Sequence, residues 1–158
     1  MSYWIEKVKA QHVAEKISSE LILGPGQSIM EIQTIESALG LRLPNELREF
    51  YQEVNGYGAP LSNSEDVDWL VVPLKDIAKT TKLAQDWFEE THPKEAGRFF
   101  AFIDWKCGDY SGYLVSESGK DCKFVTFSHE MYEFDPDQNP DDFFEISYDS
   151  FNEFLDID

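Results

Sequence analysis

Residues 28–56 read SIMEIQTIESALGLRLPNELREFYQEVNG, and their spacing predicts two helices joined by a short turn. The first helix begins at a capping box, because Ser28 and Glu31 have the S-x-x-E spacing, and it ends at Gly40. Pro44 suits the first turn of the second helix, where a missing amide hydrogen costs nothing. Apolar residues recur on one face of this second helix, namely Leu43, Leu47, Phe50, Tyr51 and Val54.

The residues before this pair, 1–27, predict a further helix that ends before the breaker Gly24-Pro25-Gly26. Its apolar residues fall into two groups on different sides of the helix. We expect the first group to face the core, and it consists of Ala10, Val13, Ala14, Ile17 and Leu21. The second group consists of Trp4, Ile5 and Val8.

The rest of the chain predicts a mostly antiparallel sheet with one inserted helix and a C-terminal helix. Short apolar or alternating runs predict strands at 69–72, 99–105, 112–116 and 122–127, and the run 131–134 is compatible with an edge strand. Pro73 opens the inserted helix, which extends through Phe88. Residues 150–155 have the cap and spacing of the last helix. Helices followed by such a sheet predict the α+β fold class.

The chain has 158 residues, of which 31 are acidic and 13 are Lys or Arg, so its formal net charge is −18. This length predicts a single domain over 1–158, with 1–27 as its N-terminal helical extension. A strongly negative surface repels nucleic-acid phosphates and anionic membranes, so we expect neither as a partner. The absence of a signal peptide and of a run of ~20 apolar residues predicts a cytoplasmic protein.

Motifs for metals, cofactors and catalysis are weak. Cys107 and Cys122 lack the spacing of a zinc site, and we expect buried or half-buried thiols. Residues 135–141 imitate the start of a calcium loop, but Pro140 stands where Gly is needed and Ile146 where a bidentate Glu is needed. No histidine pair has ligand or triad spacing, and nothing among the 31 acids selects an acid–base pair. We therefore expect no metal, no cofactor and no enzymatic activity.

Acidic residues concentrate at the end of the chain. After Lys123 there are 11 acids and nine aromatic residues but no Lys or Arg, which favours an acidic folded face over a disordered tail. Acids with interleaved aromatics suit a basic protein partner. The candidate partner-binding residues are Glu130, Tyr132, Glu133, Phe134, Asp135, Asp137, Asp141, Asp142 and Phe143. A solvated face, with the aromatic residues in the core, is the alternative.

A longer pattern resembles the SUKH superfamily. It opens with a Glu-containing helix, an LG…LP joint and a second helix that ends in Asn-Gly: Ile35-Glu36, Leu39-Gly40-Leu41-Arg42-Leu43-Pro44-Asn45-Glu46-Leu47-Arg48-Glu49-Phe50-Tyr51 and Val54-Asn55-Gly56. Weaker pieces follow in the order of that superfamily, namely Trp69-Leu70-Val71-Val72-Pro73-Leu74, Phe102-Ile103-Asp104, Gly108-Asp109 and Ser150-Phe151-Asn152-Glu153-Phe154-Leu155.

The resemblance implies an α+β domain that acts by binding. The superfamily includes bacterial immunity proteins against secreted toxins, many of them nucleases or deaminases, and fungal regulators of cell-wall glucan synthesis. It therefore implies either a cytosolic immunity protein that neutralises a basic toxin domain or a regulatory interaction scaffold with no toxin partner. The identity of the toxin and the oligomeric state are left open.

Overall fold

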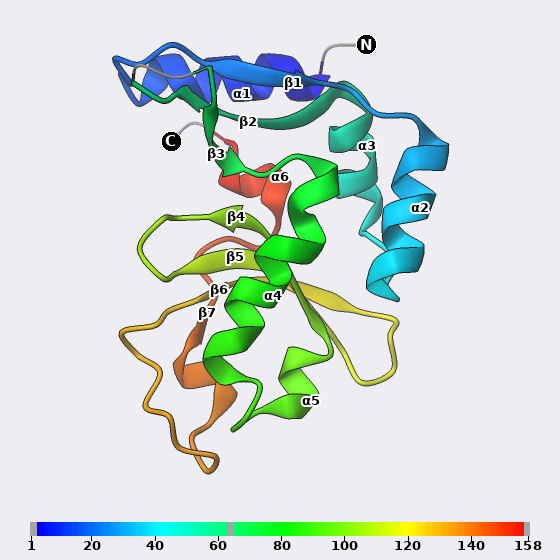
Figure 1. Ribbon diagram of the computed structural model, residues 1–158, viewed down its shortest axis with the longest axis vertical. Helices are drawn as coiled ribbons and strands as arrows, with labels where there is room; N and C mark the ends of the chain where they lie inside the picture. Colours follow the sequence, from blue (N-terminus) through cyan, green and yellow to red (C-terminus); the bar gives the residue numbers. More distant parts are fainter. Residues whose placement is uncertain (1–2, 63–64, 157–158) are drawn as a thin grey trace. The chain divides into compact units, whose positions relative to one another are not determined.

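The computed structural model describes residues 3–62 and 65–156 (Figure 1). They form two compact units. The first comprises Met1–Lys75 and Phe151–Asp158, and the second comprises Asp76–Ser150, so the chain leaves the first unit once and returns to it. The fold is α+β, with N-terminal helices, antiparallel strands, an inserted helix and a C-terminal helix, as the sequence predicts.

The first unit combines four helices with three strands. Its elements are α1 (Tyr3–Ala14), β1 (Ile22–Pro25), α2 (Ile29–Leu39), α3 (Asn45–Glu53), β2 (Val54–Pro60), β3 (Val67–Val71) and α6 (Phe151–Phe154). Strand β2 lies between β1 and β3 and pairs antiparallel with both. The 3-10 turn η1 (Leu74–Asp76) follows β3.

Helices α2 and α3 confirm the predicted pair. Ser28 and Glu31 form the capping box, and Gly40 ends α2 in the left-handed conformation, with φ of 69°. Pro44 is the residue just before α3, and its carbonyl accepts the backbone N–H groups of Leu47 and Arg48. The predicted apolar face of α3 is buried. Local signals therefore determine both helices.

The predicted orientation of the first helix is wrong. Trp4 and Val8 are buried, whereas Val13 is 74% exposed and Ile17 is 45% exposed. The helix ends at Ala14, and Lys16 then adopts a left-handed conformation that turns the chain away. The large Trp4 ring decides the orientation, because it packs against Phe151 of α6 and Phe50 of α3, with ring centroids 6.2 and 5.9 Å away. Helical spacing alone does not predict which of two apolar groups on one helix is buried.

Two short glycine segments form strands where the sequence predicts breaks. Gly24 lies in β1, and a Cβ added there would lie 2.1 Å from the Asn55 carbonyl oxygen of β2, so only glycine permits this pairing. Gly56 has φ of 85°, the left-handed conformation expected of it, but it lies within β2 rather than in a turn after α3.

The second unit places α4 (Ile77–Phe88) across a four-stranded antiparallel sheet (Figure 1). The strands lie in the order β4 (Phe99–Asp104), β5 (Tyr110–Val115), β6 (Cys122–Phe127) and β7 (Phe144–Glu145), with α5 (Pro93–Ala96) and η2 (Pro140–Asp142) in the connections. The hydroxyl of Thr81 in α4 accepts the Ala101 N–H at 2.9 Å. The predicted 112–116 and 122–127 hairpin is confirmed as β5 and β6.

Two expectations for this unit are wrong. Residues 131–134 form no strand, because the backbone there turns around a buried side chain described below, and the edge strand is β7. Cys107 and Cys122 are both free and exposed rather than buried. In addition, none of the helices in the described part of the chain has the length and hydrophobicity that crossing a bilayer requires.

Candidate functional site

Residues 128–143, here named the acidic loop, contain all nine of the predicted partner-binding residues. Both ends of the loop meet, because the Ser128 backbone N–H donates to the Phe143 carbonyl at 2.8 Å. A loop of this length with closed ends and its own packed side chains is of the Ω type, which frequently carries function. The acidic loop belongs entirely to the second unit.

Gln138 organises the interior of the acidic loop. Its side-chain amide donates to the Met131 carbonyl at 2.8 Å and accepts the Glu133 backbone N–H at 2.9 Å. The backbone carbonyl oxygen of Gln138 lies 2.8 Å from the Nε2 atom of the buried His92. A buried amide with these bonds holds an irregular backbone in one conformation. The loop is therefore a built structure and not a loose acidic segment.

Tyr132 and Phe143 form the floor of the acidic loop. Phe143 is fully buried and Tyr132 nearly so, and their rings lie 5.1 Å apart at the centroids. The Tyr132 hydroxyl is 2.5 Å from the Thr91 hydroxyl, and the Phe143 ring lies 4.9 Å from the His92 ring. The sequence left open whether these aromatic residues contact a partner or lie in the core. The structure places both Tyr132 and Phe143 in the core.

Phe134 is the aromatic residue that the loop presents to solvent. Its side chain is 63% exposed, and its backbone φ is 58°, in the left-handed region. A bulky residue in this region is strained, and such strain persists where the surrounding structure imposes it, often at functional sites. The ring packs at one edge on Tyr132, with centroids 4.5 Å apart, and lies 6.3 Å from the ring of Trp87 in α4.

All six predicted acids of the loop are exposed, namely Glu130, Glu133, Asp135, Asp137, Asp141 and Asp142. Asp135 also has a local role, since its carboxylate accepts the Asp137 backbone N–H at 2.9 Å. Nearby in the second unit, burial raises the pKa of Tyr110, and the negative charge of Asp104 raises it further. Lys82 of α4 is engaged by Asp86 and Glu89, at 2.8 and 3.1 Å. The acidic loop itself has six exposed carboxylates and no Lys or Arg, so its own field is negative.

Asp109 and His129 form a contact that sequence spacing did not predict. One oxygen of the Asp109 carboxylate accepts the backbone N–H of His129 at 3.0 Å. The same oxygen lies 2.6 Å from the Nδ1 atom of the His129 ring. Gly108 has φ of 99°, and a Cβ there would lie 3.1 Å from the His129 ring. This pair attaches the start of the acidic loop to the β4–β5 turn.

The sequence missed Gln138 and Trp87 as parts of this site. The composition around Gln138 indicated only a proline-stiffened surface loop, and its burial depends on His92, 46 positions earlier in the chain. A weak signal for Trp87 was available, since it lies among Asp86, Glu89 and Glu90 on the last turns of a predicted helix. Within the described residues, no group of three or more His, Cys, Asp or Glu side chains is arranged to hold a metal ion.

Comparison with known families agrees with the fold. The family model of the SMI1 / KNR4 family (SUKH-1) matches residues 28–157, so the chain belongs to this family. No curated protein matches the chain. Membership supports a protein-interaction or immunity-type role. The match leaves out residues 1–27, which contain α1 and β1.

Proposed function

We propose that this member of the SMI1 / KNR4 family is a cytoplasmic immunity protein that binds a basic toxin domain through the acidic loop. The observation that carries the proposal is the placement of Phe134, a strained and exposed aromatic residue in a loop with six exposed acids. A purely solvating surface gains nothing from an aromatic side chain held out by left-handed backbone.

Charge supplies the rate of association and the choice of partner. A nuclease or deaminase presents a positive surface to nucleic acid, and a face without Lys or Arg complements that surface. Such complementarity raises the association rate at low salt, because the Debye length is ~30 Å at 0.01 M salt and ~10 Å at 0.1 M. The protein would place carboxylates where the toxin binds phosphates.

Phe134 and the half-buried Trp87 supply the apolar contact. Interface energy is concentrated in a few residues, with aromatic side chains enriched among them, and rim charges contribute less. Because Gln138 and Tyr132 hold the loop before binding, little conformational entropy is lost on association. The acids and the aromatic pair thus have separate roles.

The test compares two charge-reversed variants. The first changes Glu130, Glu133, Asp137 and Asp142 of the acidic loop to Lys and leaves Asp135 to hold its turn. The control reverses four exposed acids outside the loop, namely Glu20, Glu49, Glu65 and Glu117. Each tagged protein is purified from its native cells at low salt, and its partner is identified and its association rate measured as a function of salt.

The proposal expects one basic toxin domain in stoichiometric complex with the unmodified protein and with the control variant. The loop variant should lose that partner while remaining folded, since exposed charges rarely contribute more than ~1 kcal/mol each to stability. Several unrelated partners would favour a regulatory scaffold. An association rate that is independent of salt, or a loop variant that still neutralises the toxin, would contradict the role of the loop.

A further inference from the structure

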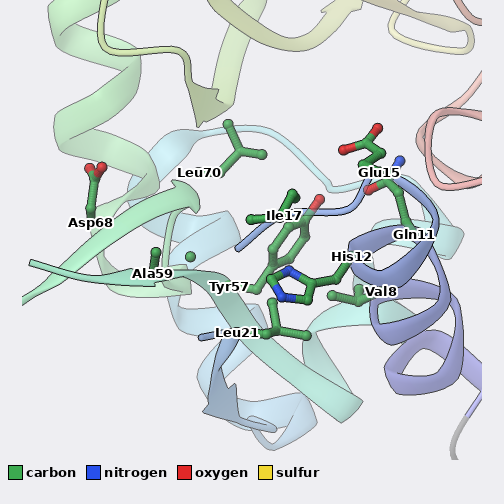
Figure 2. A pocket seen from close by; sticks show the side chains of 11 residues that line it. Val8, Gln11, His12, Glu15, Ile17, Leu21, Tyr57, Ala59, Asp68 and Leu70 are labelled. Carbon is green, nitrogen blue, oxygen red and sulfur yellow. The ribbon is translucent and has the colours of Figure 1, made fainter. Parts of the chain in front are cut away.

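The first unit contains a pocket that the acidic loop does not involve (Figure 2). It has a volume of about 200 Å³ and lies between α1, the chain that follows α1, and strands β2 and β3. Ile17 and Leu21 contribute one wall, and Leu70 of β3 contributes another part of the lining. Residues before 28 lie outside the family match, so the N-terminal extension completes a pocket on strands that the family match covers.

Tyr57 of β2 places an unpartnered hydroxyl in this pocket. Only 6% of the residue is exposed, and its hydroxyl oxygen is buried and has no hydrogen-bond partner among the described residues. Figure 2 shows the hydroxyl end of the ring directed toward the side where Gln11 and Glu15 lie. Buried hydroxyl groups are almost always hydrogen-bonded, so an unpartnered one beside a pocket favours a ligand that supplies the missing hydrogen bond.

The other polar groups determine which ligand fits. Glu15 and Asp68 both line the pocket and carry negative charge. The side-chain amide nitrogen of Gln11 donates to the Phe154 carbonyl at 2.7 Å. Its amide oxygen is an acceptor and can accept a hydrogen bond from a ligand in the pocket. Among the described residues that line the pocket there is no Lys or Arg, and His12 is the one basic side chain. An anion would be repelled by both carboxylates, whereas a cation would be attracted to them.

We propose that this pocket binds the arginine side chain of a protein partner. The planar guanidinium has five N–H donors, so it can supply the hydrogen bond that the Tyr57 hydroxyl oxygen lacks and can also donate to the Gln11 amide oxygen and the Glu15 carboxylate. Its three methylene groups pack on Ile17, Leu21 and Leu70. A cavity of about 200 Å³ accommodates one side chain and is smaller than a pocket for a drug-sized ligand. This inference does not depend on the acidic loop.

The probe is a pentapeptide with blocked ends and one arginine between glycines. Binding to the full-length protein is followed by NMR chemical shifts, with an expected Kd of about 1 mM for a single side chain. The matched peptide carries citrulline in place of arginine, which has nearly the same shape but no charge. Butylguanidinium serves as the free small cation, and butyrate as the anion of similar size.

Two substitutions test the assigned atoms. Tyr57→Phe removes only the hydroxyl and keeps the ring, and Glu15→Gln removes one charge from the lining. Each should weaken binding of the arginine peptide about five- to ten-fold, the range of one ordinary hydrogen bond. The control is Glu20→Gln, which changes an exposed acid close in sequence but outside the lining and should leave the Kd unchanged.

The proposal is supported if the arginine peptide shifts the signals of Tyr57 and Leu70 and the citrulline peptide does not. Equal binding of both peptides, tighter binding of butyrate, or an unchanged Kd in Tyr57→Phe would overturn it. Binding of butylguanidinium without binding of the peptide would overturn the assignment to a protein partner. Loss of folding cannot mimic the expected result, because Tyr57→Phe deletes a group that has no partner to lose.

Discussion

The left-handed backbone at Phe134 predicts an inverted order of stability for two substitutions. At ordinary positions a glycine is less stable than an alanine by ~0.5–1 kcal/mol, because glycine loses more conformational freedom on folding. At Phe134, with φ of 58°, an L-residue is strained by roughly 1–2 kcal/mol. Phe134→Gly should therefore be more stable than Phe134→Ala by about 0.5–1 kcal/mol.

Both variants lose the same ring contacts. The pair with Tyr132, at 4.5 Å, contributes about 0.5–1.5 kcal/mol, so both should lie at or below the unmodified protein, with alanine lowest. Met131 provides the control, since it lies in the same loop, is 51% exposed and has an ordinary negative φ. There the alanine variant should be the more stable of the two.

Urea unfolding followed by circular dichroism measures the four free energies of unfolding. Affinity for the basic partner gives a second measurement, because Phe134→Gly and Phe134→Ala remove the same aromatic ring. Their affinities should fall equally, by about 2 kcal/mol or more if Phe134 anchors the interface. Alanine equal to or more stable than glycine at this position would refute the left-handed conformation, and unchanged affinity would refute the anchor.

Three further substitutions test the interior of the protein. Gln138→Met removes the two side-chain bonds inside the acidic loop and should cost about 2–4 kcal/mol, with faster amide exchange at 130–137; unchanged exchange would contradict its role. Tyr57→Phe should raise stability by about 1 kcal/mol at neutral pH. Burial raises the pKa of Tyr57, so above pH 10.0 the unfolded chain releases the hydroxyl proton while the folded protein keeps it. The unmodified protein therefore loses stability as the pH rises, and the stability difference in favour of Tyr57→Phe should grow by about 1.4 kcal/mol per pH unit in denaturant titrations. A difference that stays constant with pH would contradict the burial. Leu47→Ala removes a fully buried side chain of α3 and should cost about 2–5 kcal/mol in urea unfolding.

The sequence predicted the residues of the candidate site, and their role in binding a partner stays a prediction. Charge and aromatic content located the acidic loop, because both are properties of the chain itself and survive in any fold. The sequence did not predict that Phe134 lies at the surface and Phe143 in the core, because the residues around both have the same composition. The difference depends on the connection between α4 and α5, where Thr91 contacts Tyr132 and His92 contacts Phe143. Local sequence patterns do not predict contacts between residues so far apart in the chain.

The sequence by itself determined those elements whose signals lie within a few residues. The Ser28–Glu31 capping box, the left-handed Gly40 and the apolar face of α3 each act through neighbours one or two turns away, so they fix helix ends wherever the helix is packed. Tertiary structure alone decided the pairing of Gly24 with the β2 backbone, the burial of Trp4 and the buried, unpartnered hydroxyl of Tyr57. These features require segments far apart in the chain to meet, and the free energy of such contacts is set by shape and burial at the meeting point, which no local pattern encodes.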